Sequence, residues 1–218
     1  MTLSYSRGPH YGVEPRPPES LRLTLPNREI TLSPLTEERL KYCLDEHRID
    51  HSGWGEGESM KTVSALHLEL RRGESQLWVD SNDMLIRKIE VLSLEVSCTD
   101  PSGQELILSE QKILDQKSGR SKTRPNVRSV SEKLMRGEAI VAGIARAMRE
   151  ETGILCAYTW EIQDHSQEFH QSTSFPGLPT LAMITHAKVI LEDSQFLPDG
   201  YECEDNGRTT FFQWRRPE

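Results

Sequence analysis

The chain has 218 residues, of which 35% are hydrophobic and 28% are charged, a composition that suits a globular protein rather than a disordered or membrane-spanning one. Its 26 lysines and arginines against 34 aspartates and glutamates leave a formal net charge of -8 at pH 7. This acidic balance argues against general nucleic-acid binding, because neutralising a phosphate backbone needs a basic surface.

The four cysteines are far apart in the sequence and form no Cys-x-x-Cys pair, so a zinc site is not expected. No signal peptide and no apolar run near bilayer-spanning length is recognisable. These features predict reduced thiols in a cytoplasmic protein that does not associate with membranes.

The first part of the chain is predicted to be a tail and an extension. Residues 1–20 are rich in proline and glycine and poor in apolar residues, which predicts a flexible tail. Residues 21–74 are predicted to form an N-terminal hairpin and helical extension. The hairpin is expected from alternating segments within residues 21–32, on either side of the turn Pro26-Asn27.

Two helices are expected in this extension. Ser33 is a plausible N-cap of the first helix, with Pro34 at the first helical position. The second helix is expected from about Met60 to Arg72, ended by Gly73. Trp54 lies in a glycine-rich loop, where it could be a ligand platform, but filling the space between the loop and the core is the favoured role.

From residue 75 to 218 the pattern is strands, one helix and strands again, which predicts a mixed α/β sandwich. The turn Asp100–Gly103 is expected to join two paired strands, and a basic loop is expected at Lys117–Arg124. Strands are expected at 76–79, 85–96, 105–114, 158–162, 168–174, 180–191 and 209–214.

The helix of this second part carries the most informative pattern in the chain. The segment from Glu138 to Glu151 is amphipathic, ends in the adjacent carboxylates Glu150 and Glu151, and is followed by Gly153. Carboxylates at a helix end that faces a loop are typical ligands of Mg²⁺, which takes oxygen ligands and keeps several waters.

This run resembles the Nudix box, which reads Gly, five residues, Glu, seven residues, Arg-Glu-apolar-x-Glu-Glu-x-Gly-apolar. Two positions depart from it: Glu132 stands where the first glycine belongs, and Ala147 stands where a glutamate belongs. Aligned on Gly153, the matching positions are Glu138, Arg146, Met148, Glu150, Glu151 and Ile154.

Segments outside the box strengthen the resemblance. Ser131–Leu134, Phe175–Thr180 and the Gly53-Trp54-Gly55 loop look like a little-characterised eukaryotic Nudix-like subgroup. The resemblance implies a Nudix-like mixed β-sheet sandwich with a helix bearing the box, plus an N-terminal helical extension.

The resemblance also implies a site. Glu138, Glu150 and Glu151 would hold Mg (or Mn), and the ion would bridge a diphosphate as water attacks phosphorus. Arg146 would orient Glu150 and pair with Glu138, and these four residues are the candidate catalytic group. Arg124 and Arg128 are candidates for binding the substrate's phosphates.

Ala147 decides how far that chemistry can be expected. Positions 147, 150 and 151 are spaced i, i+3 and i+4, so they are predicted to share the metal-facing side of the helix. A glutamate at position 147 is expected to fit at the edge of that side. The adjoining face is predicted to pack on the sheet through Ile140, Val141, Ile144, Ala145 and Met148.

Two functions therefore stay open at this stage. One is a Mg-dependent hydrolase of a nucleoside-diphosphate-linked or other diphosphate substrate with an impaired box. The other is a degenerate fold that acts as a binding or interaction module, or that performs non-hydrolytic chemistry on a small molecule. The expected partner is a small-molecule diphosphate or another small-molecule ligand. The oligomeric state is left open, with a homodimer among the arrangements allowed.

Overall fold

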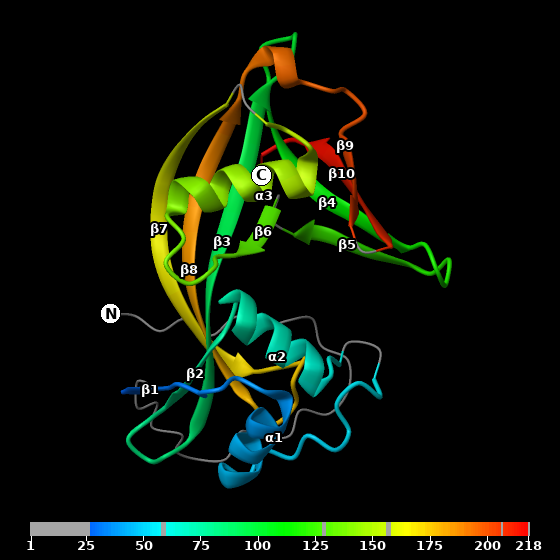
Figure 1. Cartoon of the computed structure of the whole chain (residues 1–218). Helices are drawn as coiled ribbons and strands as arrows, with labels where there is room; N and C mark the ends of the chain where they lie inside the picture. Colours follow the sequence, from blue (N-terminus) through cyan, green and yellow to red (C-terminus); the bar gives the residue numbers. More distant parts are fainter. Residues whose placement is uncertain (1–26, 58–59, 128–129, 156–157, 206, 218) are drawn as a thin grey trace, which may run out of the picture. The chain divides into compact units, whose positions relative to one another are not determined.

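The computed structural model describes residues 27–57, 60–127, 130–155, 158–205 and 207–217, without the side chains of 124–127 and Asp205 (Figure 1). The expected flexible tail at residues 1–20 and the first arm of the expected hairpin lie outside these residues. The chain divides into two compact units: unit 1 comprises residues 1–89 and 167–183, and unit 2 comprises residues 90–166 and 184–218. The sequence-based division between residues 74 and 75 stays a prediction.

The secondary structure is mostly antiparallel sheet with three α-helices. The helices are α1 (Glu37–Glu46), α2 (Val63–Arg72) and α3 (Ile140–Thr152), and a 3₁₀ turn spans Asp193–Gln195. The strands are β1 (Arg28–Ile30), β2 (Gln76–Val79), β3 (Leu85–Thr99), β4 (Glu105–Asp115), β5 (Ser121–Val127), β6 (Val130–Lys133), β7 (Tyr158–Gln171), β8 (Pro179–Leu191), β9 (Tyr201–Asp205) and β10 (Arg208–Arg215).

Strand pairing follows the order β1-β2-β3-β4-β10-β9, with β5 paired to β4, β6 and β8 paired to β3, and β7 paired to β8. The registers of β2 on β3, β4 on β3, β6 on β3 and β10 on β4 are antiparallel. Figure 1 shows the arrowheads of β3 and β8 pointing the same way, so one pair is parallel. The expectation of a mixed sheet is confirmed.

The helices of unit 1 begin and end at identifiable caps. The Thr36 hydroxyl accepts a hydrogen bond from the Arg39 amide at 3.3 Å, so α1 begins after Thr36. The expected N-cap at Ser33 is therefore wrong, because Thr36 offers the same side-chain oxygen directly before two glutamates that favour the helix N-terminus. Helix α2 ends at Gly73 in the left-handed conformation, as predicted.

The core of unit 1 forms between the two helices, β2 and the segment after β7. Leu40, Leu44, Leu66 and Phe175 have no exposed surface. Trp54 packs its ring on Phe175 at a centroid distance of 5.1 Å, and its Nε1 donates to the Pro176 carbonyl at 2.9 Å. Trp54 therefore fills the gap between its loop and the core, as the sequence predicted.

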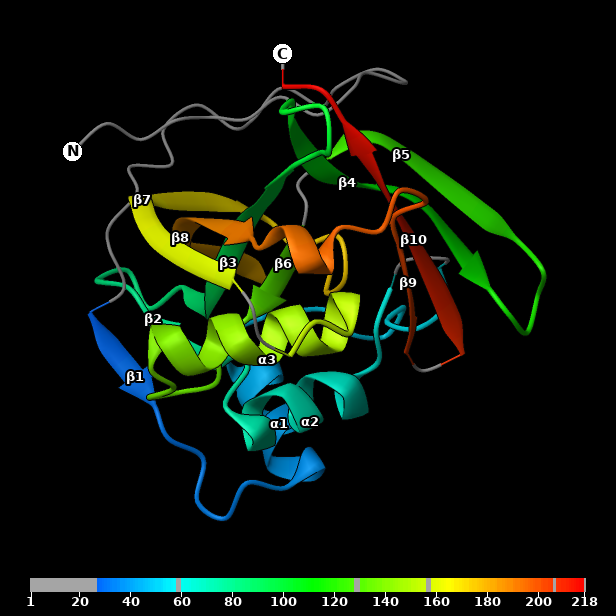
Figure 2. The same ribbon diagram turned by 90° about the horizontal axis from the view of Figure 1, so that it is seen from above.

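In unit 2, helix α3 covers one face of the sheet. Figures 1 and 2 show it lying across β3, β6 and β8. Its buried side chains belong to one hydrophobic cluster with apolar residues of β3, β4, β6, β8, β9 and β10. The members of this cluster are Leu92, Leu94, Val96, Cys98, Leu108, Val130, Leu134, Ile144, Ala147, Met148, Ile154, Ala187, Val189, Leu191, Tyr201 and Phe212.

The expected packing face of α3 is partly wrong. Ile144 and Met148 are buried as predicted, but Val141 is 54% exposed and Ala145 is exposed. The helix lies close to the turn after β6 at Gly143, where an added Cβ would lie 2.2 Å from a Leu134 methyl carbon. A side chain at Gly143 would therefore hold the helix away from Leu134.

Other segment boundaries differ from the prediction. The turn after Asp100 is confirmed, with Cys98 opposite Leu106 in the register. The expected basic loop at 117–124 is shorter, because β5 begins at Ser121 and pairs with β4. The two strands expected at 158–162 and 168–174 are one continuous strand to Gln171. Strands β6 and β9 were not predicted. Among the described residues, no helix combines the length and apolarity needed to cross a bilayer.

Candidate functional site around the box helix

The turn between β6 and α3 places Glu138 at the start of the box helix. Gly137 adopts the left-handed conformation with a φ of 75°, which glycine takes without steric cost. The Glu138 amide donates to the Met135 carbonyl at 2.8 Å, and the Glu138 carboxylate accepts from the Met135 amide at 2.9 Å. These two bonds hold the carboxylate in one orientation.

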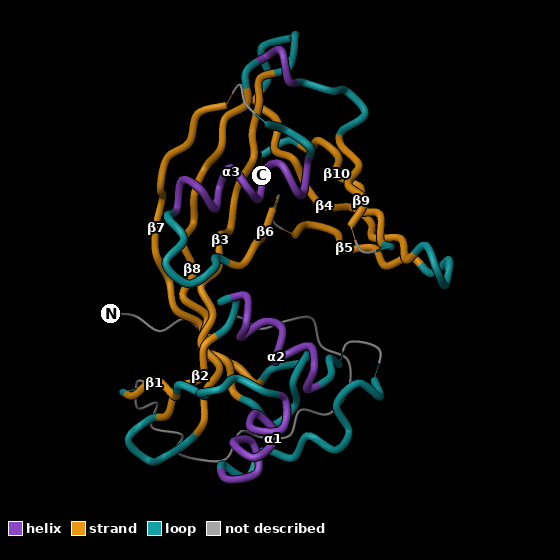
Figure 3. Tube along the Cα trace, in the orientation of Figure 1, coloured by secondary structure: helices purple, strands orange, loops and turns teal. Residues whose placement is uncertain are grey.

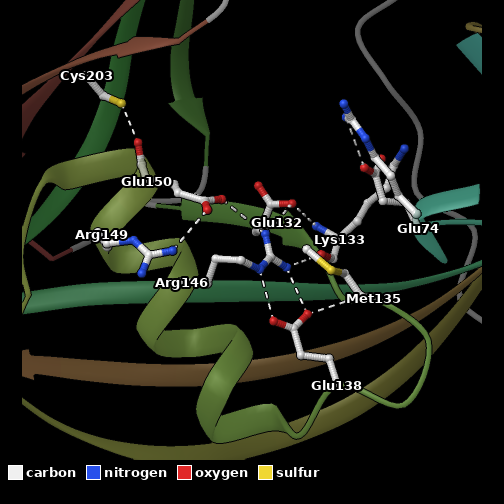
Figure 4. A network of polar contacts seen from close by, with 10 residues as sticks. Glu74, Glu132, Lys133, Met135, Glu138, Arg146, Arg149, Glu150 and Cys203 are labelled. Atoms are coloured by element: carbon white, nitrogen blue, oxygen red, sulfur yellow. Dashed lines mark hydrogen bonds and ion pairs between the residues drawn. The ribbon is translucent and has the colours of Figure 1, made fainter. Parts of the chain in front are cut away.

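Arg146 is the centre of the polar network, as Figure 4 shows. Its Nε and Nη2 donate to the two oxygens of Glu138, both at 3.0 Å, which is the strong two-pronged geometry of guanidinium and carboxylate. Nη2 also donates to the Lys133 carbonyl at 2.6 Å. The side chains of Arg146 and Glu138 are each only 13% exposed. The expected pairing of Arg146 with Glu138 is confirmed.

The charges of this pair stabilise one another. The hydrogen bond to Arg146 holds the pKa of Glu138 below its ordinary value of 4.5, and burial opposes that effect. The same hydrogen bond raises the pKa of Arg146. Glu138 is therefore ionised at neutral pH and is neutralised by a guanidinium.

Glu132 adds a second carboxylate to Arg146. This residue occupies the position where the resemblance expects a glycine, and its Oε1 lies 3.3 Å from Nη1 of Arg146. From the sequence, Glu132 was only a departure from the pattern, and its contact with Arg146 was not predicted. The available signal was a glutamate in place of a glycine six residues before Glu138.

The paired glutamates at the end of α3 differ in their surroundings. Glu150 is 45% exposed; its Oε2 lies 3.2 Å from Nη1 of Arg146 and its Oε1 lies 3.2 Å from Nη2 of Arg149. The Cys203 thiol on β9 donates to the Glu150 carbonyl. The expected contact between Arg146 and Glu150 is confirmed. Glu151 is half-buried.

Ala147 lies in the hydrophobic core rather than at the edge of the polar side. It has no exposed surface and belongs to the same cluster as Ile144 and Met148. A glutamate at position 147 was expected to fit at the edge of the metal-facing side, and this is wrong, because the position is enclosed by the hydrophobic core. Helical spacing still relates position 147 to Glu150 and Glu151.

The arrangement does not fit a Mg²⁺ site. Among the residues that the structure describes, no group of three or more His, Cys, Asp and Glu side chains is arranged to hold a metal ion. Mg²⁺ requires near-octahedral oxygen ligands. Glu138 and Glu150 instead direct their oxygens at the Arg146 guanidinium, which supplies the positive charge that a metal would supply.

The two candidate phosphate-binding arginines are not placed by the structure. Arg124 belongs to β5 by its backbone, and its side chain lies outside the described residues. Arg128 lies outside the described residues altogether. Their role in substrate binding stays a prediction.

Comparisons with known proteins give structural matches only. No protein-family model matches the chain, and no curated protein matches it. A C. elegans Ap4A hydrolase is 17% identical over 59% of this chain and 80% of its own, with a TM-score of 0.33. A MutT of Aliivibrio salmonicida or Vibrio cholerae has the same identity, coverage and TM-score. A Deinococcus radiodurans protein is 15% identical over 64% of this chain and 81% of its own, with a TM-score of 0.35. At these TM-scores the likeness does not establish a shared fold.

The fold and the site together define an α/β protein with a mostly antiparallel sheet and a helix whose acidic end is paired to a central arginine.

Proposed function

We propose that this chain is a Nudix-like domain whose box has become a structural element and which works by binding a ligand rather than by hydrolysing it. The ligand class is the one that the sequence suggests, a small-molecule diphosphate or another small molecule. The alternative is Mg-dependent hydrolysis of a diphosphate, with Mg or Mn held by Glu138, Glu150 and Glu151. The experiment below separates this alternative from the binding function.

One observation carries the proposal: the position that should supply a third carboxylate is Ala147, and it has no exposed surface. A carboxylate that acts as a positioned base contributes on the order of 10²–10⁴ in rate. A carboxylate from a neighbouring surface residue cannot occupy the position of the Ala147 side chain, because the hydrophobic core fills the space around it.

The ion pairs of Arg146 support the same conclusion. A metal ion placed between Glu138 and Glu150 would compete with a guanidinium that already bonds both carboxylates. Releasing them would leave Arg146 partly buried beside a divalent cation, and like charges in such surroundings repel strongly. The network therefore favours a metal-independent role.

The decisive experiment measures turnover and metal affinity together. We expect no hydrolysis of nucleotide sugars, dinucleotides, capped RNA or prenyl diphosphates with Mg²⁺ or Mn²⁺. Isothermal titration with Mn²⁺ should give the same weak heat for the wild type and for Glu151→Gln, because these carboxylates are not ligands. Turnover that depends on metal and is lost in Glu151→Gln would overturn the proposal and establish the hydrolase.

Ligand binding is tested with the same compounds by thermal shift without metal. A rise in Tm that is unchanged by EDTA supports a binding module. A rise that appears only with Mn²⁺ contradicts it, since the proposal requires no ion.

A further inference from the structure

The segment Tyr158–Ser166 of β7, which belongs to unit 2, is an edge strand. Among the described residues, β7 pairs only with β8, and Figure 3 shows it as the outermost strand beside β8. All seven residues from Thr159 to His165 are exposed, so both faces of the segment reach solvent as well as its outer edge. An edge of this kind presents a row of backbone donors and acceptors to a further strand.

This edge lacks the features by which proteins usually protect an edge strand. Tyr158–Ser166 contains no proline, glycine or lysine and is rich in aromatic and β-branched residues. The edge strand β5 differs, since it contains Lys122 and Pro125. The carboxylates of Glu161 and Asp164 restrict the registers in which another strand can be added.

An apolar patch lies beside the edge. Trp160 is 39% exposed, and Ile162 and Ile190 are each 42% exposed. The Ser166 hydroxyl lies 2.9 Å from Nε2 of His186, which places these two residues on one face. Because side chains alternate along a strand, Trp160 and Ile162 share that face with Ile190 of β8. It is the face opposite Ala187 and Val189, which pack under α3.

We propose that the β7 segment pairs antiparallel with the same segment of a second copy of this chain and so forms a two-fold dimer. A two-fold interface joins one surface to itself, so the segment must be complementary to its own copy. The proposal concerns a surface away from the box helix and does not depend on the proposed function.

The charges of the segment select the register. Registers centred on Glu161 or Asp164 set that carboxylate opposite its own copy, and like charges directly opposite each other destabilise a sheet. A register centred on His165 sets the two imidazoles opposite each other and pairs neither with a carboxylate. The register centred on Gln163 sets Glu161 of each copy opposite His165 of the other, so the favourable pair occurs twice. A register centred on Ile162 forms no such pair.

The surroundings of His165 suit this pairing. Its Nδ1 lies 3.1 Å from the Thr185 hydroxyl. When that hydroxyl donates to Nδ1, Nε2 carries the proton and is a donor for a carboxylate. The neutral imidazole can then bond the Glu161 of the second copy without being protonated.

Sedimentation equilibrium on the full chain tests the dimer. The wild type should associate as its concentration rises. Ile162→Glu should leave a monomer, because in this register it puts a carboxylate directly opposite Asp164 of the second copy, and this happens twice in the interface. Leu155→Glu is the matched control, since Leu155 is a 71% exposed hydrophobic residue outside β7, and it should associate like the wild type. Circular dichroism melting should show that both variants are folded.

Two further variants test the register. Glu161→Lys should weaken association at least tenfold, and adding His165→Glu should restore it by reversing the pair. Gln163→Cys lies on the two-fold axis, so mild oxidation should link two copies through it more completely than in Ile162→Cys or the wild type. Preferential linking through Ile162→Cys would overturn the register.

A monomer at every concentration, or a dimer that survives Ile162→Glu, overturns the proposal. Slow amide exchange of residues 158–166 in a monomer would also overturn it, because it would show that another part of the same chain covers the edge.

Discussion

Ala147 shows how a single side chain sets the limits of this site. Its methyl group packs with Ile144 and Met148 against the sheet, and it has no exposed surface. Arg146, its neighbour in the chain, points to the other side of the helix and bonds Glu138. Adjacent positions on a helix lie 100° apart, so the same turn can supply both a core residue and the centre of a polar network.

Ala147→Glu is expected to destabilise the protein by at least about 3 kcal/mol, because it buries a carboxylate without a partner. It should not create diphosphate hydrolysis. Urea unfolding measures the loss. Ala145→Glu is the matched control, since Ala145 is exposed on the same helix and should change stability by less than about 0.5 kcal/mol. Equal stability of the two variants, or activity gained in Ala147→Glu, would contradict the buried position.

The Glu138 carboxylate gives a second test at the residue scale. Its pKa in the folded protein is below 4.5 because Arg146 bonds its charged form. The unfolded chain therefore binds the proton first as pH falls, so the contribution to stability is complete above about pH 4.5 and is lost as pH falls through the folded pKa.

In Glu138→Gln this contribution is absent at every pH, and the cost at neutral pH should be about 1.5–3 kcal/mol. The difference in unfolding free energy between wild type and variant should shrink as pH falls from 6 toward 3. The amount by which it shrinks is set by the lowering of the Glu138 pKa on folding. Taking the difference cancels the contributions of the other carboxylates that titrate in this range, because both proteins contain them. A difference that is independent of pH would show that Glu138 and Arg146 do not pair in solution.

At the scale of elements, unit 1 contains a buried ion pair that joins α2 to β3. Nη2 of Arg87 lies 2.6 Å from Oε2 of Glu69, and each side chain is 6% exposed. The Ser75 hydroxyl donates to the same Glu69 oxygen at 2.7 Å and accepts from Nε of Arg87 at 3.0 Å. The Arg87 guanidinium also lies over the Phe175 ring at 5.1 Å. Both charged side chains therefore have further hydrogen-bond partners, which a buried ion pair requires.

Removing one partner of this pair should cost more than replacing both. Glu69→Ala is expected to lose about 3–5 kcal/mol, because Arg87 remains buried without its carboxylate. The double variant Glu69→Leu/Arg87→Met should lose less than either single change, since apolar residues of similar size leave no uncompensated charge. Urea unfolding of the double variant and of Glu69→Leu and Arg87→Met alone measures the coupling. Additive losses would show that the two charges act independently.

At the scale of the whole molecule, the charge balance bears on partners. The formal net charge of -8 favours dispersal in water and repels polyanions. Acidic residues are placed throughout the chain, and several of the basic ones are neutralised locally: Arg146, Arg87 and Lys188 each pair with carboxylates.

Double-stranded DNA and RNA of mixed sequence are therefore expected not to bind at physiological salt. Fluorescence anisotropy with labelled duplexes measures this, and a run at low salt provides the comparison, since phosphate contacts strengthen as salt falls. Salt-dependent binding in the range typical of non-specific nucleic-acid proteins would show a basic surface that the charge balance conceals.

Local patterns were enough to predict much of this protein from its residues. The glycine stops at Gly73 and Gly153 and the turn after Asp100 were predicted, because each depends on residues within a few positions of one another. The pairing of Arg146 with Glu138 and Glu150 also followed from helical spacing and charge.

Only the tertiary structure decided how the box helix is rotated on the sheet. Helical spacing relates positions 147, 150 and 151 to each other but does not say which of them faces inward. That depends on the fit of Gly143 against Leu134, in the turn after β6, and against Leu92 of β3. Close packing, rather than the motif, placed Ala147 in the core and left Arg146 to hold the carboxylates together.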